Sequence, residues 1–304
     1  MKKLQGLRRG DTVALLAPAS AVKEEYCDGA ERWLIEKGFK VKRYPSACGG
    51  TAGSYSASAT DRRGELCDAL ADPGIKGILC ARGGYGCIHL LEEATPLFGA
   101  NPKWIIGFSD VSALHAMAQC SGFCSIHAPM AKHLAESPCD EVSSLWLQTL
   151  VSGRQQTVSY PTAEGSIAGE AEGVLIGGNL AVLNSLAATP WDILSLPLSR
   201  PSILVMEDIS EAIYAVERMV YRLHLSGVLG VLKGIAVGQF TEYRPDRNYV
   251  SVEEMLAERF REWNVECPVA FRFPVGHVAD NRPLLMGSEC RLTVTSDTTV
   301  LEPV

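Results

Sequence analysis

The sequence predicts an α/β protein of two domains: an N-terminal flavodoxin- or Rossmann-like domain with a parallel sheet, and a C-terminal mixed α/β domain richer in strands. Through the first half, short apolar runs alternate with amphipathic stretches, a pattern typical of parallel strands joined by helices. The alternation stops where small and polar residues predominate, and it resumes further on. We therefore expect domains at 1–152 and 171–304, joined by a linker at 153–170.

The expected elements follow from apolar periodicity and from Gly, Pro and Ser punctuation. No internal repeat of 20 to 50 residues is visible, which excludes solenoid and propeller folds. In the first domain we expect strands at 12–17, 40–44, 77–80 and 104–107, and helices at 24–37, 61–71, 86–93 and 110–120. In the second we expect strands at 172–176, 203–206, 234–238 and 291–294, and helices at 179–186, 212–225 and 252–263.

The composition indicates an ordinary folded chain without a nucleic-acid partner. Hydrophobic residues make up 47% and charged residues 21%, and the net charge is −7, whereas nucleic-acid binding calls for a basic surface. We interpret the basic pairs Arg8-Arg9 and Arg62-Arg63 as solvated surface. The N-terminus carries no apolar signal segment, and no apolar run approaches the roughly 20 residues of a membrane span. We expect a cytoplasmic protein that does not insert into membranes.

Ten cysteines are present, and none belongs to a Cys-x-x-Cys pair. Their spacing fits neither a zinc ribbon nor a disulfide framework, so we expect most to be small buried hydrophobes. Cys120 and Cys124 lie one helical turn apart, but no suitably spaced histidine pair completes a metal site. We expect no metal and no organic cofactor.

The sharpest local signal is an apolar strand that runs into Gly107-Phe108-Ser109 and continues directly as a helix. This context is that of a nucleophile elbow, in which a sharp turn exposes the serine hydroxyl at the sheet edge. The following amide, that of Asp110, lies at a helix N-terminus and can donate to a developing oxyanion. The usual second glycine is replaced by Val111. The alternative is that Ser109 only caps the helix.

A glycine run, Arg82 to Gly86, follows the strand expected at 77–80. Glycines let a backbone approach a ligand and present amides to an anion, and Arg82 can bind a carboxylate. A dinucleotide fingerprint is not matched, because His89 occupies the last glycine position. The alternative is a plain tight turn.

A serine nucleophile needs a base, and His277 is the favoured candidate. It lies in a loop with Gly and Pro, and catalytic side chains are frequent on such loops. His127 and His133 flank another loop and could approach the site. An ordinary exposed loop histidine is the alternative for His277. The remaining histidines, His89, His115 and His224, fall in helical patterns and are expected to be surface or packing residues.

Glu207 is the candidate carboxylate. It ends the apolar strand expected at 203–206, where a buried acid needs a partner, and an imidazolium would suit. An ion pair with an arginine such as Arg218 is the alternative, and Glu211 is a rival near the same strand end. The order Ser…Glu…His is that of hydrolases with the elbow motif.

Taken together, these blocks resemble the LD-carboxypeptidases, a family of serine peptidases, through nearly the whole chain. Singly none of them is specific, but their joint order is. The blocks are Gly10 to Pro18, Ala81 to Gly86, Gly107 to Asp110, Gly177 to Leu180, Glu207 to Ile209 with Glu211, and Gly276-His277 with Asn281.

The resemblance implies a two-domain enzyme, often a homodimer, that needs no cofactor. It implies that Ser109 is the nucleophile, Glu207 the triad acid and His277 the triad base. The oxyanion hole would be formed by the amides of Asp110 and of a glycine of the Gly83-Gly84 pair, for which we take Gly84. Arg82 and Gly83 are assigned to substrate binding.

The implied reaction is removal of the terminal D-alanine from a small peptide, the murein tetrapeptide, during cell-wall recycling. The third residue of that peptide, lysine or diaminopimelate, is left open. A related branch cleaves a microcin-type peptidyl-nucleotide antibiotic and confers immunity; its members tend to carry an extra recognition loop that this chain lacks. Two hypotheses from other classes are a non-catalytic module that binds a small ligand, and a thiol enzyme that uses Cys80 or Cys87.

Overall fold

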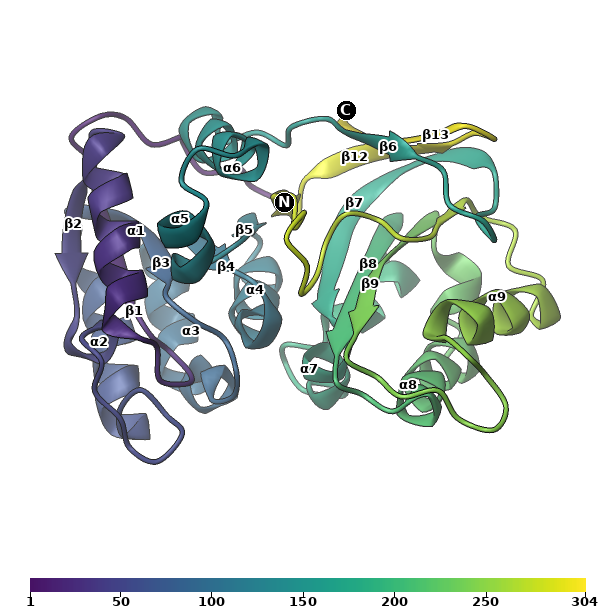
Figure 1. Ribbon diagram of the computed structural model, residues 1–304, viewed down its shortest axis with the longest axis horizontal. Helices are drawn as coiled ribbons and strands as arrows, with labels where there is room; N and C mark the ends of the chain where they lie inside the picture. The colour runs from purple at the N-terminus through teal and green to yellow at the C-terminus, as the bar shows by residue number, and fades with distance from the viewer. The chain divides into compact units, whose positions relative to one another are not determined.

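The structure is a computed structural model that describes residues 1–304 and divides into two compact units. Unit 1 comprises Met1–Arg154 and Arg282–Gly287, and unit 2 comprises Gln155–Asn281 and Ser288–Val304. Each unit is built around its own sheet (Figure 1). The predicted α/β class, with a parallel N-terminal sheet and a mixed C-terminal one, is confirmed. No helix combines the length and the apolar composition that crossing a membrane requires.

Unit 1 contains a six-stranded sheet in the order β11-β5-β4-β3-β1-β2, parallel throughout except for β11. Its strands are β1 (Thr12–Leu16), β2 (Lys40–Arg43), β3 (Ile75–Cys80), β4 (Trp104–Gly107), β5 (Ser125–His127) and β11 (Leu284–Met286). Its α-helices are α1 (Glu24–Glu36), α2 (Ala59–Ala71), α3 (Leu91–Ala100), α4 (Ser112–Cys120), α5 (Ala131–Glu136) and α6 (Glu141–Ser152).

Helices cover both faces of this sheet. Helix α1 packs against α5, and both lie on the near side of the strands in Figure 1, while α2, α3 and α4 pack in a row. Strands β1 and β4 are buried almost throughout, which explains why they read as continuous apolar runs rather than alternating ones. Under α1, Trp33 and Trp146 meet edge to face, with ring centroids 5.3 Å apart.

The strand order places a candidate binding region at the carboxyl edge of the sheet of unit 1. The chain moves outward from β1 to β2 on one side and through β3, β4 and β5 on the other. The loops that follow β1 and β3 therefore leave neighbouring strands at the point where the order reverses. Open α/β sheets bind ligands at this position.

Unit 2 contains a seven-stranded mixed sheet in the order β10-β9-β8-β7-β12-β13-β6. The first four strands of that order are parallel and the last three join antiparallel (Figure 1). Its strands are β6 (Val158–Pro161), β7 (Gly169–Asn179), β8 (Ser202–Ile209), β9 (Gly234–Thr241), β10 (Val269–Ala270), β12 (Glu289–Val294) and β13 (Thr298–Pro303). Its α-helices are α7 (Leu180–Ser185), α8 (Ile213–Leu225) and α9 (Val252–Glu262).

Short side-chain caps set several helix starts. Ser58 accepts the amide of Asp61 before α2, Asp140 accepts that of Ser143 before α6, and Ser251 accepts that of Glu254 before α9. Each cap satisfies one of the backbone donors that a helix leaves without a partner at its start.

Two features of the connectivity differ from the sequence expectations. The segment 153–170, expected as a linker, contains β6 at Val158–Pro161, which pairs with β13. Residues 282–287, expected in the C-terminal domain, belong to unit 1, because β11 pairs with β5 at the sheet edge.

His115 on α4 is fully buried behind the end of β4. Its Nε2 lies 2.8 Å from the Gly107 carbonyl, so Nε2 carries the proton, and its Nδ1, 2.9 Å away, accepts from the Ser125 hydroxyl. Burial lowers the pKa of His115 to about 4. The neutral imidazole therefore ties the last residue of β4 to β5.

We predict that this histidine makes stability fall on acidification. In the unfolded chain His115 is protonated below about pH 6.5, whereas in the folded protein it stays neutral down to about pH 4. The contribution of neutral His115 to the free energy of unfolding is therefore complete above about pH 6.5 and is lost as the pH falls to about 4. The shift corresponds to about 3 kcal/mol in the free energy of unfolding. Urea titrations of wild type and His115→Asn at several pH values measure it. The variant should show the shallower acid dependence, and an acid dependence equal to that of wild type would contradict the prediction.

Candidate active site

Ser109 occupies a strained turn between β4 and the helix that follows. Its φ is +63°, a left-handed conformation that non-glycine residues rarely adopt. A short 3₁₀ turn, Ser109–Val111, leads into α4, and neither has a side-chain cap at its start. The alternative of a simple helix cap is therefore not realised. The strand, the strained serine and the helix together have the geometry of a nucleophile elbow.

The glycine run after β3 lies directly against this turn. A Cβ atom at Gly83 would stand 3.0 Å from the Ser109 Cβ, and 3.2 Å from both the Ser109 Oγ and the Asp110 amide nitrogen. Only glycine allows this approach without displacing the serine. Across residues 1–304, the amides of Gly83, Gly84 and Asp110 donate to no protein acceptor. Three backbone donors beside a serine can stabilise an oxyanion.

The side chain of Asp110 has a structural function in this region. It is buried, and its carboxylate accepts the amide of Cys87 at 2.8 Å. Burial raises the pKa of Asp110 above its usual range. The residue after the serine thus fixes the end of the glycine run.

The two arginines near the run behave differently. Arg82 is exposed, and one of its nitrogens donates to the Ala21 carbonyl at 2.6 Å, so other donors of the fork face solvent. Arg62 is only 1% exposed, and the interpretation of the Arg62-Arg63 pair as solvated surface is wrong for this member. Its guanidinium is held by backbone carbonyls from separate loops, which compensate for its burial.

Unit 2 brings Glu207 and His277 together. Nδ1 of His277 lies 2.9 Å from Oε2 of Glu207. Because a carboxylate only accepts hydrogen bonds, Nδ1 carries the proton and the ring's lone pair lies on Nε2. The Glu207 side chain has no solvent exposure, and His277 Nδ1 is its only hydrogen-bond donor.

Backbone glycines make room for this pair. A Cβ at Gly276 would stand 3.2 Å from both Cβ and Oε2 of Glu207 and 2.9 Å from the Gln239 carbonyl. Gly276 also donates its amide to the buried side chain of Asn281 at 3.1 Å. The loop that carries His277 is therefore closed on itself by a hydrogen bond.

The rival candidates have other surroundings. His133 contacts Asp140, and His127 is buried against the rings of Phe108 and His115. The Arg218 guanidinium lies over the Tyr214 ring rather than on Glu207. Glu207, rather than Glu211, is the carboxylate that contacts His277.

Neither cysteine near the glycine run has the properties of a nucleophile. Cys80 and Cys87 are fully buried, and burial raises the pKa of each thiol well above its usual value. The neighbouring Asp110 carboxylate acts in the same direction. Reactive thiols need a lowered pKa and access to solvent, so the thiol-enzyme hypothesis lacks support.

The sequence did not indicate three further residues around these sites. Arg62 and His115 organise the backbone around Ser109, and Asp208 binds the amide of Ala181 and the side chain of Asn179 beside Glu207. Burial raises the pKa of Asp208 to about 6. Asp208 lies in the block Glu207 to Ile209 that carries the family resemblance, but no local sequence signal indicates the hydrogen-bonding role of any of the three residues.

Comparison with known protein families assigns both halves of the chain. Residues 13–128 match the family model of the LD-carboxypeptidase N-terminal domain, and residues 172–292 match that of the C-terminal domain. The chain belongs to the LD-carboxypeptidase family. The resemblance that the sequence motifs indicated is confirmed, as is the prediction of a carboxypeptidase of this family.

Individual relatives agree with this assignment. The murein tetrapeptide carboxypeptidase of Pseudomonas aeruginosa is 33% identical over 282 residues, which cover 89% of either chain. The structure of muramoyltetrapeptide carboxypeptidase from Oxalobacter formigenes has a TM-score of 0.82 at 24% identity, covering 96% of this chain and all of the other. The apo structure of the microcin C7 self-immunity protein MccF has a TM-score of 0.84 at 22% identity, covering 100% and 99%. At such identities these two structures establish the shared fold.

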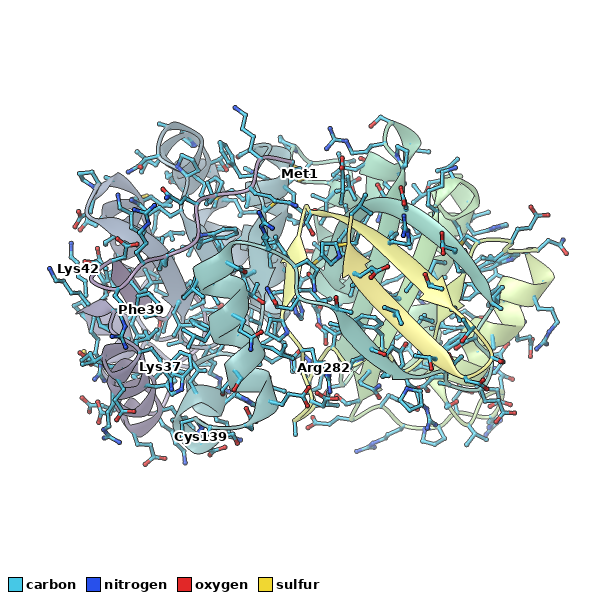
Figure 2. The ribbon with its side chains drawn as sticks, turned by 90° about the horizontal axis from the view of Figure 1, so that it is seen from above. Met1, Lys37, Phe39, Lys42, Cys139 and Arg282 are labelled. Atoms are coloured by element: carbon cyan, nitrogen blue, oxygen red, sulfur yellow. The ribbon has the colours of Figure 1, made fainter.

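We predict that the thiols divide by burial when the native protein meets iodoacetamide. Cys48, Cys120 and Cys139 are exposed and should be alkylated rapidly, whereas Cys80 and Cys87 should react only after unfolding. Figure 2 shows Cys139 at the periphery of unit 1. Peptide mapping by mass spectrometry measures each site. Rapid alkylation of Cys80 or Cys87 with loss of activity would instead restore the thiol-enzyme hypothesis.

Proposed function

We propose that this protein is a serine LD-carboxypeptidase that releases the terminal D-alanine from a murein tetrapeptide. The observation that carries the proposal is the left-handed Ser109 turn, with the acceptor-free amides of Gly83, Gly84 and Asp110 beside it. A ligand-binding module has no need of a strained serine at such a place. The name of the Pseudomonas aeruginosa relative supports the choice of substrate.

In the proposed mechanism, Nε2 of His277 accepts the Ser109 proton as Oγ attacks the carbonyl carbon before the terminal D-alanine. Glu207 accepts from Nδ1, holds the required tautomer and stabilises the imidazolium. The imidazolium then protonates the leaving amine, and free D-alanine departs from an acyl-enzyme. Water, activated by the same imidazole, hydrolyses that ester and releases the tripeptide.

The oxyanion of each tetrahedral intermediate would accept from the amide of Asp110 and from that of Gly84. Loss of one such donor typically costs about 3 kcal/mol of transition-state stabilisation. Gly83 lies closest to the serine and would form the wall of the cradle. The exposed fork of Arg82 would bind the terminal carboxylate of the substrate, and this charge would select for a free C-terminus.

The microcin-type immunity reaction is the less favoured alternative. The structure of MccF shares the fold at 22% identity, whereas the Pseudomonas aeruginosa relative has 33% identity over most of both chains. A homodimer, which the family resemblance implies, and a cytoplasmic location, which the sequence pattern led us to expect, are parts of the same proposal.

We predict that wild type shortens a murein tetrapeptide by one alanine and that Ser109→Ala lowers kcat by roughly 10⁴-fold or more, because the nucleophile is lost. Mass spectrometry of the peptide, run with lysine and with diaminopimelate at the third position, measures both effects. Ser121→Ala, at the far end of α4, is the matched control and should retain wild-type turnover. Wild-type turnover by Ser109→Ala would refute the assigned nucleophile.

A fluorophosphonate probe separates the peptidase from a ligand-binding module. The probe should label Ser109 in wild type and in Ser121→Ala. Labelling should fail in Ser109→Ala and slow strongly in His277→Gln, since the serine then lacks its base. An unlabelled wild-type protein that still binds the tetrapeptide would favour the module.

A further inference from the structure

Arg62 on α2 is a buried cation without a carboxylate partner. Its Nη1 donates to the carbonyls of Pro18 at 2.6 Å and Gly86 at 3.0 Å, and its Nε donates to that of Ala57 at 3.2 Å. Tyr55 lies under the guanidinium, with its ring centroid 4.8 Å from Cζ. A well-packed apolar side chain is often the more stabilising choice at a buried site, so a charge here calls for another explanation.

One of these contacts reaches a peptide unit of the glycine run that is also bound from its other side. The carbonyl of the Gly86–Cys87 peptide accepts from Arg62, and the N–H of the same peptide donates to the Asp110 carboxylate at 2.8 Å. Asp110 directly follows Ser109. A single peptide plane is thus held between α2 and the serine turn: Arg62 binds its carbonyl oxygen and the Asp110 carboxylate binds its N–H.

The other end of the run is held through the loop after β1. The amide of Ser20 donates to the Gly83 carbonyl at 3.1 Å, and its hydroxyl accepts the Tyr85 amide at 3.3 Å. Arg62 also donates to the carbonyl of Pro18, two residues before Ser20. Arg62 therefore fixes both loops that border the amides of Gly83 and Gly84.

We propose that Arg62 is a positioning residue that orients these two amides toward Ser109 without touching the substrate. The inference rests on the proposed function, since it assigns the orientation a catalytic use. An amide donor displaced by a fraction of an ångström loses much of its effect on a developing oxyanion, because hydrogen bonding depends steeply on geometry.

The test compares Arg62→Met with Arg63→Met, its neighbour on the same helix. Arg63 forms a partly exposed ion pair with Glu93 and serves as the matched control. We expect Arg62→Met to fold, to lower kcat on the tetrapeptide by about 10²-fold, as for loss of one oxyanion donor, and to change KM little. Arg62→Lys should retain part of the wild-type kcat, and Arg63→Met should retain all of it.

Two further measurements distinguish positioning from general destabilisation. Guanidinium ion, at concentrations far below those that unfold the protein, should restore kcat of Arg62→Ala by occupying the vacated site, and methylammonium should do so less well. Amide hydrogen exchange should accelerate in Arg62→Met at Tyr85 and Cys87, the amides of the run that donate to Ser20 and Asp110, and remain unchanged over 104–107.

The outcomes separate the two proposals. The inference is overturned if Arg62→Met folds and keeps wild-type kcat and wild-type amide exchange. It is also overturned if kcat falls only in proportion to the amount of folded protein and guanidinium does not restore it. If wild type neither cleaves the tetrapeptide nor reacts with fluorophosphonate, the proposed function fails. The exchange measurement then still decides whether Arg62 holds the glycine run.

Discussion

The left-handed backbone of Ser109 is the constraint around which unit 1 is organised. Such a conformation costs about 1–3 kcal/mol and persists only where the surroundings over-determine it. Before the turn, the Gly107 carbonyl accepts from both His115 and the amide of Ala128. After the turn, the Asp110 side chain is fixed on the Cys87 amide. The strain is thus held from both sides by buried hydrogen bonds, and the hydroxyl keeps its place without help from a substrate.

In unit 2 the corresponding constraint is the buried contact between Glu207 and the His277 imidazole, which orients the ring. Glu207 is fully buried with one donor, so nearly all of its compensation comes from the His277 imidazole. Because a buried carboxylate without a hydrogen-bond donor is costly, this contact strongly favours the observed orientation of the ring. Gly276 permits the close approach, since a Cβ there would stand 2.9 Å from the Gln239 carbonyl and would crowd Glu207 at 3.2 Å. The same contact therefore sets both the tautomer of the base and the conformation of its loop.

The sequence predicted the fold well where the signal is local. The strand at 104–107 and the helix at 213–225 can be predicted from the apolar pattern of their own residues alone. The Ser109 elbow is likewise indicated by consecutive residues. It misjudged Arg62, whose acceptors lie in three loops that only the tertiary fold brings together. The pairing of Glu207 with His277, 70 residues apart, followed only from the family resemblance, because no local pattern links residues so distant in the chain.

The strand β11 shows why the compact units do not coincide with halves of the chain. Its three residues carry no detectable period, yet they pair with β5 in antiparallel register and cover an edge of the sheet of unit 1. Leu285 belongs to the core of unit 1 although it follows the His277 loop by only a few residues. An N-terminal fragment ending near residue 154 would thus expose the edge of β5 and lose part of its core, a combination that favours aggregation. The chain crosses between units at 154–155, 281–282 and 287–288, so the segment that carries the candidate base is tethered to unit 1 immediately after its loop.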